Sequence, residues 1–236
     1  VFHRFGSEVT VIEYLKECIP ALDSDIAKRL RKLLEKRGIT FHMKTAVQSL
    51  KDIDADVILM ATGRKPRTAG LNLNAAGITL APNGAIPVDE NFTVTLLGGG
   101  SLYAIGDVNG RQMLAHAAEM QAVRAVNQIL GRQDSIRFDI MPAAIFTEPE
   151  AACVGPTEDQ LKAQGIPYIC KKAFWRANGK ALAMNETEGM LKLFASPEGQ
   201  ILGCHAYGAH AADIVQEVSV LMCKDTTLSE LADMAH

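Results

Sequence analysis

The sequence has 236 residues, of which 48% are hydrophobic and 22% are charged, and its formal net charge is −3 at pH 7. This length suffices for one large globular domain or two small ones. The lysines and arginines are dispersed, which argues against nucleic-acid binding, and no apolar run approaches the roughly 18 residues needed to span a membrane.

The cysteines are odd in number and widely spaced. They are Cys18, Cys153, Cys170, Cys204 and Cys223. None belongs to a C-x-x-C or other close pair, so the spacing indicates neither a disulfide framework nor a metal site. The opening VFHRFGSE does not resemble a signal peptide. We therefore expect a reducing, cytoplasmic environment.

The first residues predict the end of a helix closed by Gly6, and then a strand over residues 8–12 that ends at Glu13. This order is typical of the second half of a dinucleotide-binding βαβ unit, whose acidic residue accepts hydrogen bonds from ribose hydroxyls and repels a 2′-phosphate. The glycine-rich turn that normally precedes the acid does not occur in the sequence. A glutamate that follows a strand is also common as a plain surface residue, so both interpretations stay open.

Asp23 is predicted to cap a helix that runs to about Arg37, because apolar residues recur there on one face and Gly38 follows. Strands are expected next at residues 39–43 and 56–61. The segment from Pro66 to Asn91 is rich in glycine, asparagine and proline, and it predicts loops with short strands, residues 84–89 among them.

The stretch from Ser101 to Gln121 has a strand–loop–helix pattern. Residues 102–105 predict a buried parallel strand that stops at Gly106-Asp107, and a helix is expected from near Leu114 to Leu130. An aspartate at the end of a strand can accept polyol hydroxyls, and the N-terminus of a helix favours negative charge. The pattern suits flavin adenine dinucleotide (FAD), although an ordinary strand–loop–helix unit fits it as well.

An α+β segment begins at about Asp139. A strand bordered by prolines and a helix at residues 157–164 are expected first. Three strands and a helical C-terminal segment follow, at residues 167–174, 189–195, 201–206 and 207–236. The last segment has a common apolar face formed by Ile214, Val218, Leu221 and Met222.

Several motifs together resemble the pyridine nucleotide–disulfide oxidoreductases, and above all the dihydrolipoamide dehydrogenase branch. They are GSEVTVIE, ATGRKP, YAIGDV with MLAHAAEMQA, FTEPEAACVGPTEDQ, FWRANGKALAMNETEG and ILGCHAYG. The resemblance implies an α/β nucleotide-binding, partial Rossmann-like domain at residues 1–66 and a central flavin-contacting region at residues 67–138. An α+β dimerisation domain would follow at residues 139–236.

The resemblance also implies the residues that contact cofactors. FAD would be held by Asp107 and by the run Met113, Leu114, Ala115 and His116, with His116 as a contact and not as a base. NAD would be contacted by Glu13, Val47 and Gly63. Val47 is followed closely by the strand expected at residues 56–61, whereas the family normally carries a β-meander between them. No catalytic residue and no metal ligand is expected.

The family's redox-active cysteine pair would lie upstream of Val1. His236 matches the first histidine of the family's C-terminal motif, so the catalytic histidine would fall two residues beyond it. The resemblance therefore implies the C-terminal half of a homodimeric enzyme that oxidises dihydrolipoamide with NAD⁺. Its partner would be the lipoyl-bearing protein of a 2-oxoacid dehydrogenase or glycine cleavage complex.

Two alternatives stay open. One is a sister disulfide reductase of the mercuric reductase or soluble transhydrogenase type, because the residues that select the substrate would lie upstream. The other is a non-catalytic nucleotide-binding or dimerisation module.

Overall fold

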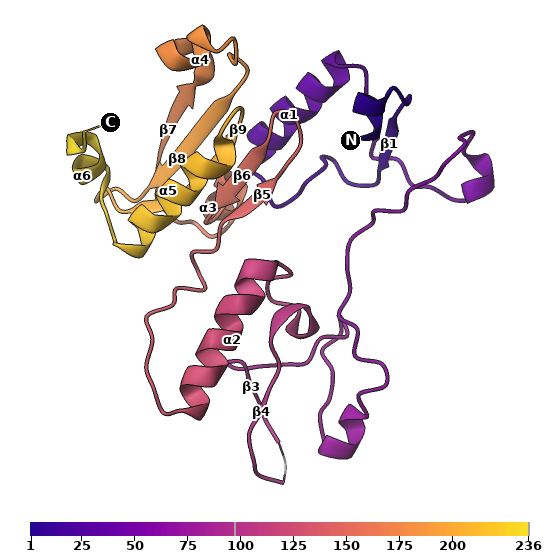
Figure 1. Cartoon of the computed structure of the whole chain (residues 1–236), viewed down its shortest axis with the longest axis vertical. Helices are drawn as coiled ribbons and strands as arrows, with labels where there is room; N and C mark the ends of the chain where they lie inside the picture. The colour runs from indigo at the N-terminus through magenta and orange to yellow at the C-terminus, as the bar shows by residue number, and fades with distance from the viewer. Residues whose placement is uncertain (97, 236) are drawn as a thin grey trace. The chain divides into compact units, whose positions relative to one another are not determined.

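The computed structural model describes residues 1–96 and 98–235. The chain divides into two compact units (Figure 1). The first unit combines residues 1–54 with the segment from Asp139 onward, and the second comprises Ala55–Phe138.

The N-terminal part of the first unit has the predicted order of elements. A 3-10 turn at Phe2–Phe5 is closed by Gly6, and strand β1 (Thr10–Glu13) pairs in parallel with β2 (Thr40–Met43). Helix α1 (Ser24–Lys36) connects them, and the Asp23 carboxylate caps it by accepting the Asp25 N–H. A short 3-10 turn follows at Leu50–Asp52. The predicted helix and the strand over residues 39–43 are confirmed.

The C-terminal part of the first unit is built on a five-stranded antiparallel sheet with the order β5-β6-β9-β8-β7. Its strands are β5 (Ala143–Ile145), β6 (Ala151–Val154), β7 (Ile169–Phe174), β8 (Met190–Ala195) and β9 (Ile201–Tyr207). Three of them match predicted strands. The single strand expected before residue 156 is instead the pair β5 and β6, because the turn at residues 146–150 lets them pair antiparallel.

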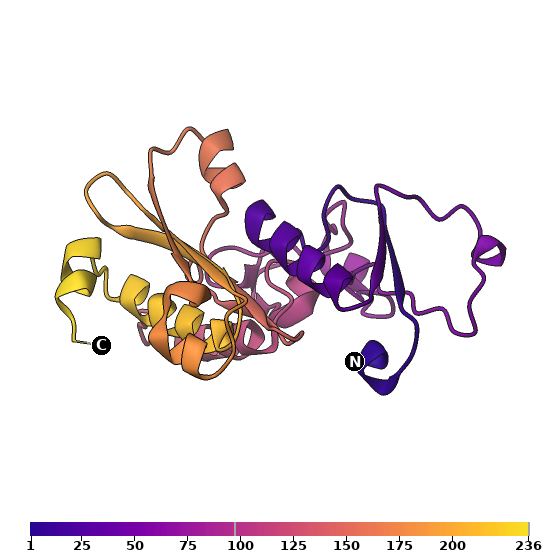
Figure 2. The same ribbon diagram turned by 90° about the horizontal axis from the view of Figure 1, so that it is seen from above.

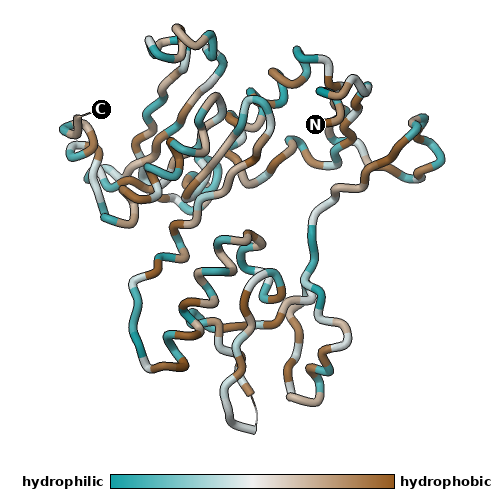
Figure 3. The backbone as a smooth tube through the Cα atoms, in the orientation of Figure 1, coloured by the Kyte–Doolittle hydropathy of each residue, from teal (hydrophilic) through white to brown (hydrophobic). Residues whose placement is uncertain are grey.

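The two faces of this sheet are covered by helices from opposite ends of the chain. Helix α1 packs Ile26 and Leu30 with Met190 and Tyr207 on one face, and α5 (Ala211–Cys223) packs on the other. Figure 2 shows the two helices on opposite sides of the sheet. Hydrophilic and hydrophobic residues alternate along α1 in Figure 3, as its amphipathic pattern predicts.

Short helices complete this unit: α3 (Glu158–Ala163), α4 (Gly179–Ala183), the 3-10 turn Trp175–Ala177 and α6 (Leu228–Asp233). The helix predicted over residues 207–236 is broken between α5 and α6. Asp225 has a φ of 53°, which ends α5, and the Thr227 side chain caps α6. On α5, Val215, Val218 and Met222 are buried in the chain's own core.

The second unit packs α2 (Ala115–Ile129) with irregular segments. Two short 3-10 turns occur at Leu73–Ala76 and Gly106–Asn109. A two-stranded antiparallel sheet joins β3 (Thr93–Val94) to β4 (Leu102–Tyr103). A small core contains Ile78, Ile86, Val94 and Ala104.

Three strand predictions in the second unit are wrong. The strand expected at residues 102–105 is only two residues long and antiparallel, and residues 84–89 form no strand. Residues 56–61 form none either, and Val57 and Met60 are 83% and 74% exposed. Within the described residues, this apolar run takes part in no β-ladder, and a strand requires a hydrogen-bonded partner.

Candidate functional site

The Asp107 loop is held on α2 by a buried side chain. Gly106 has a φ of 75°, in the left-handed region, and a Cβ atom there would lie 3.3 Å from the Ala118 Cβ. The Gly106 N–H donates to Gln121 Oε1 at 2.7 Å, and Asn109 Nδ2 donates to the same oxygen at 2.7 Å. Glycine and Gln121 together allow the loop to approach the helix closely.

Asp107 itself faces a cation that the sequence did not single out as a partner. Arg64 Nη2 lies 2.7 Å from Asp107 Oδ2, and the Asp107 side chain is 39% exposed. The ATGRKP segment therefore lies next to the loop of the YAIGDV motif, although about forty residues of sequence separate them. The Asp107 carboxylate keeps solvent access and can accept a further hydrogen bond.

The start of α2 provides the second element of this site. Leu114 is its N-cap residue, and its apolar side chain makes no capping hydrogen bond. Met113 and Leu114 are half-buried, whereas Ala115 and His116 are exposed. The structure thus brings together the five residues predicted to contact FAD, with the positive end of a helix dipole among them.

Gln121 is a further polar residue that the sequence analysis missed. It is fully buried and its Nε2 has no hydrogen-bond partner, while its Oε1 accepts two hydrogen bonds. A glutamine on the buried side of an amphipathic helix was the signal that could have revealed it. An acceptor for hydroxyls, an uncapped helix N-terminus and an unsatisfied buried amide fit a cofactor with a polyol chain and a ring that becomes anionic.

The residues predicted to contact NAD in the first unit lie at one edge of the β1–β2 pair. Glu13 is the last residue of β1 and is paired in register with Met43, the last residue of β2. Glu13 Oε1 accepts the Leu15 N–H at 2.7 Å, and Val47, 47% exposed, follows β2. Ligands of parallel α/β units bind at the carboxyl ends of the strands, which is where this edge lies.

Gly63 belongs to the second unit, with Asp107. Its φ is 108°, and a Cβ there would meet no heavy atom within 4 Å, so the backbone conformation and not crowding requires glycine. His236, matched above to the family's C-terminal motif, lies outside the described residues.

The five cysteines are all free thiols. Burial raises the pKa of Cys153 to about 11 and that of Cys204 to about 12. Burial, together with the nearby Glu17 carboxylate, raises the pKa of Cys18 to about 11. These three side chains are therefore protonated at neutral pH and have none of the thiolate character of a reactive cysteine.

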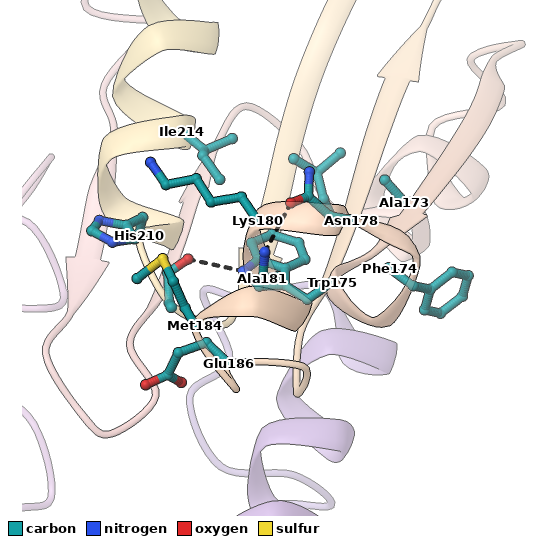
Figure 4. A pocket seen from close by; sticks show the side chains of 12 residues that line it. Ala173, Phe174, Trp175, Asn178, Lys180, Ala181, Met184, Glu186, His210 and Ile214 are labelled. Carbon is teal, nitrogen blue, oxygen red and sulfur yellow. Dashed lines mark hydrogen bonds between the residues drawn. The ribbon is translucent and has the colours of Figure 1, made fainter.

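A cavity of about 380 Å³ opens elsewhere in the first unit (Figure 4). Trp175, Met184 and Ile214 supply apolar walls, and His210 lies at its rim near Lys180. Trp175 Nε1 donates to the Ala209 carbonyl at 2.9 Å, which fixes the indole. None of the residues predicted to contact a cofactor lines this cavity.

Among residues 1–96 and 98–235, no group of three or more histidine, cysteine or acidic side chains is arranged to hold a metal ion. No helix in the part of the chain that the structure describes is long and apolar enough to cross a membrane.

Two family models match the chain. The model described as pyridine nucleotide-disulphide oxidoreductase matches residues 1–122, and the model of the dimerisation domain of these oxidoreductases matches residues 141–236.

Among curated relatives, a leghemoglobin reductase of Glycine max is 36% identical and a mitochondrial dihydrolipoyl dehydrogenase of Pisum sativum is 35% identical. Dihydrolipoyl dehydrogenase 3 of Pseudomonas putida is 34% identical. All three alignments cover 100% of the chain and 48%, 50% and 54% of these relatives, respectively. The chain thus spans about half the length of the curated relatives it matches.

Solved structures also match the chain over its full length. The HOCl-induced flavoprotein disulfide reductase RclA from Escherichia coli matches with a TM-score of 0.86 and 25% identity, over 100% of this chain and 57% of its own. LpdA from Mycobacterium tuberculosis matches with a TM-score of 0.84 and 27% identity, over 100% of this chain and 54% of its own.

Proposed function

Because the chain belongs to the pyridine nucleotide–disulphide oxidoreductase family, we propose that it forms the nicotinamide-binding and dimerisation part of a dihydrolipoamide dehydrogenase. The reaction is dihydrolipoamide + NAD⁺ → lipoamide + NADH + H⁺. Two thiols lose two electrons and two protons, and NAD⁺ takes up a hydride. Relatives named dihydrolipoyl dehydrogenase, at 34% to 35% identity, support this choice within the family.

The observation that best supports FAD binding is that Asp107 is grouped with the start of α2, where no side chain makes a capping hydrogen bond. FAD, when bound, would supply the electron transfer between the dithiol and the nicotinamide. The Asp107 carboxylate would accept a hydrogen bond from a hydroxyl of its polyol chain. The N–H groups at the start of α2 would stabilise negative charge on its ring, since a helix N-terminus favours anions.

The proposed binding of NAD⁺ depends on Glu13. Its carboxylate lies at the carboxyl end of β1, with Oε1 oriented by the Leu15 N–H, and it accepts hydrogen bonds from ribose hydroxyls. A 2′-phosphate at the same position would meet a like charge, so NAD⁺ is preferred over NADP⁺. Val47, which follows β2, presents its backbone to the same dinucleotide, and Gly63 is the proposed NAD contact of the second unit.

The protein acts as a homodimer through residues 139–236, and the matched dimerisation domain supports this. The apolar face of α5 is weaker support than the sequence suggested, since Val218 and Met222 pack on the chain's own sheet. The proposed domains are an NAD-binding domain at residues 1–66, a flavin-contacting region at residues 67–138 and a dimerisation domain at residues 139–236. The partner is the lipoyl-bearing protein of a 2-oxoacid dehydrogenase or glycine cleavage complex, and the compartment is the cytoplasm.

A sister disulfide reductase is the second candidate. The likeness to RclA, at a TM-score of 0.86, supports it, and so does the relative named leghemoglobin reductase. The test is to purify the protein at its full natural length, measure FAD per chain, and compare dihydrolipoamide with other dithiols and with mercuric ion. A flavin-containing protein that turns over another substrate but not dihydrolipoamide would favour the second candidate. A flavin-free protein would contradict both.

A further inference from the structure

A buried ionic network joins the start of α1 to the sheet that α1 covers. Its central members are Asp23, Lys192 and His205, whose exposed fractions are 0%, 1% and 0%. Lys192 Nζ donates to Asp23 Oδ1 and to Glu158 Oε2, each at 2.6 Å. Buried charges are costly unless they are paired and hydrogen-bonded, and all the charges here are paired.

Asp23 is the residue on which the network converges. Besides the bond from Lys192, its carboxylate accepts the Asp25 N–H at 3.1 Å in α1 and the Glu158 N–H at 3.0 Å in α3. Its own N–H donates to His205 Nδ1 at 3.0 Å. One carboxylate therefore caps two helices that are far apart in the sequence, and backbone and side chain of Asp23 are both fixed.

The segment fixed in this way carries the chain from the acidic end of β1 to α1. This segment, residues 14–22, is called the acidic-strand loop here. It is held at its far end by Asp23 and near its middle by Glu17, which accepts from Arg31 Nε at 2.6 Å. At its near end, the Leu15 N–H donates to the Glu13 carboxylate at 2.7 Å. The orientation of Glu13 is therefore tied to the position of the loop.

We propose that Asp23 and Lys192 are positioning residues for the dinucleotide: they anchor the acidic-strand loop and so hold the Glu13 carboxylate in the orientation that accepts the ribose hydroxyls. Neither residue touches the dinucleotide. They act through the loop and through the Leu15 N–H. The inference rests on the proposed function in one respect, the identity of the ligand that Glu13 binds.

Lys172 offers a matched control for Lys192. It lies directly opposite Lys192 on the neighbouring strand β7 and also contacts the start of α1, through Asp25 at 3.3 Å. Its side chain is 42% exposed, against 1% for Lys192. Lys172→Met therefore removes the same chemical group from the same face of the sheet without touching the buried network.

The test uses the protein at its full natural length and four forms of it: wild type, Asp23→Asn, Lys192→Met and Lys172→Met. Asp23→Asn is the milder variant, because Lys192 keeps Glu158 as a partner and no unpaired buried charge results. It keeps the proposal testable if Lys192→Met fails to fold. Calorimetric titration with NAD⁺ gives Kd, steady-state kinetics gives KM and kcat, and hydrogen exchange without nucleotide reports on the loop.

We expect Kd and KM for NAD⁺ to rise at least about tenfold in Asp23→Asn and in Lys192→Met, with kcat at saturating NAD⁺ within about twofold of wild type. Amides of residues 14–22 should exchange at least about ten times faster in both, while amides of α5 keep their protection. Lys172→Met should match wild type in every measurement.

Two results would overturn the proposal. One is an NAD⁺ affinity in both network variants equal to that of Lys172→Met. The other is faster exchange spread equally over the loop and α5, which would indicate a structural role alone. If wild type does not bind NAD⁺, the proposed function is contradicted, and the exchange rates still decide whether the network anchors the loop.

Discussion

The guanidinium of Arg64 lies 2.7 Å from the carboxylate of Asp107. These two residues come from separate motifs, ATGRKP and YAIGDV, and their contact joins the segments predicted to serve the nicotinamide and the flavin. The Arg64 side chain is 74% exposed, so solvent screens the pair. The pair therefore orients the Asp107 side chain more than it stabilises the fold.

Asp107→Ala should lower flavin retention more than it lowers fold stability. A charge-assisted hydrogen bond to a hydroxyl of the cofactor is worth about 1.5 to 3 kcal/mol. Flavin per chain after extended dialysis measures the effect, with Asp56→Ala as the control, since Asp56 is an exposed aspartate of the same unit. A variant at Asp107 that keeps its full flavin content would remove this residue from the site.

Arg64→Met should change the free energy of unfolding by less than about 1 kcal/mol, because exposed ion pairs contribute little. Denaturant unfolding of wild type and variant measures this change. A loss of several kcal/mol would mean that the pair supports the fold and would weaken its assignment to the cofactor site.

Glu13→Gln should reduce the preference for NAD⁺ over NADP⁺, because a neutral amide does not repel the 2′-phosphate. The expected change corresponds to about 1 to 3 kcal/mol in the ratio of the two kcat/KM values. Glu8→Gln removes an exposed carboxylate ahead of β1 and serves as the control. If wild type uses both cofactors equally well, Glu13 does not select the nucleotide.

Lys192→Met should lower the free energy of unfolding by about 3 to 5 kcal/mol, because it leaves the buried Asp23 carboxylate without its counter-ion. Lys172→Met, which removes an exposed partner of Asp25, should cost less than about 1 kcal/mol. Chemical denaturation gives both values. Similar losses in the two variants would contradict a special role for the buried lysine.

Acid should weaken the same network. Hydrogen bonding from Lys192 lowers the pKa of Glu158 from 4.5 to about 2, so its contribution is complete above 4.5 and is lost as the pH falls toward 2. Burial lowers the pKa of His205, whose Nδ1 must stay unprotonated to accept the Asp23 N–H. The unfolded state therefore binds more protons, and stability falls as the pH drops below about 6.5.

Unfolding free energies measured between pH 8 and pH 3 test this dependence. His205→Asn keeps an acceptor but does not titrate, so it should flatten the upper part of the decline, which begins below about pH 6.5. A variant curve parallel to that of wild type would show that His205 is not the titrating group.

Local signals in the sequence were sufficient for several elements. Asp23 and Gly38 mark the ends of α1 by capping, and the periodicity of Ile26 and Leu30 gives its buried face. What could not be predicted is that this face covers an antiparallel sheet formed by residues more than 100 positions away. Sequence periodicity shows that a face is apolar, and it does not show which surface covers it.

The strand predicted at residues 56–61 failed for a related reason. An apolar run rich in Val, Ile and Leu favours a strand, but a strand also needs a partner, and pairing is not a local property. In the candidate site, too, some features follow from the local sequence and others from long-range contacts. Asp107 and the start of α2 follow from local pattern, whereas the roles of Arg64 and Gln121 depend on contacts between distant segments.

Reduction of NAD⁺ by dihydrolipoamide, followed with the protein at its full natural length, tests the central claim most directly. We predict FAD-dependent turnover with dihydrolipoamide, with a kcat/KM for NAD⁺ well above that for NADP⁺ and loss of activity when flavin is removed. A flavin-loaded protein that forms no NADH from dihydrolipoamide, while it reduces another disulfide or a metal ion with a nicotinamide cofactor, would contradict the account.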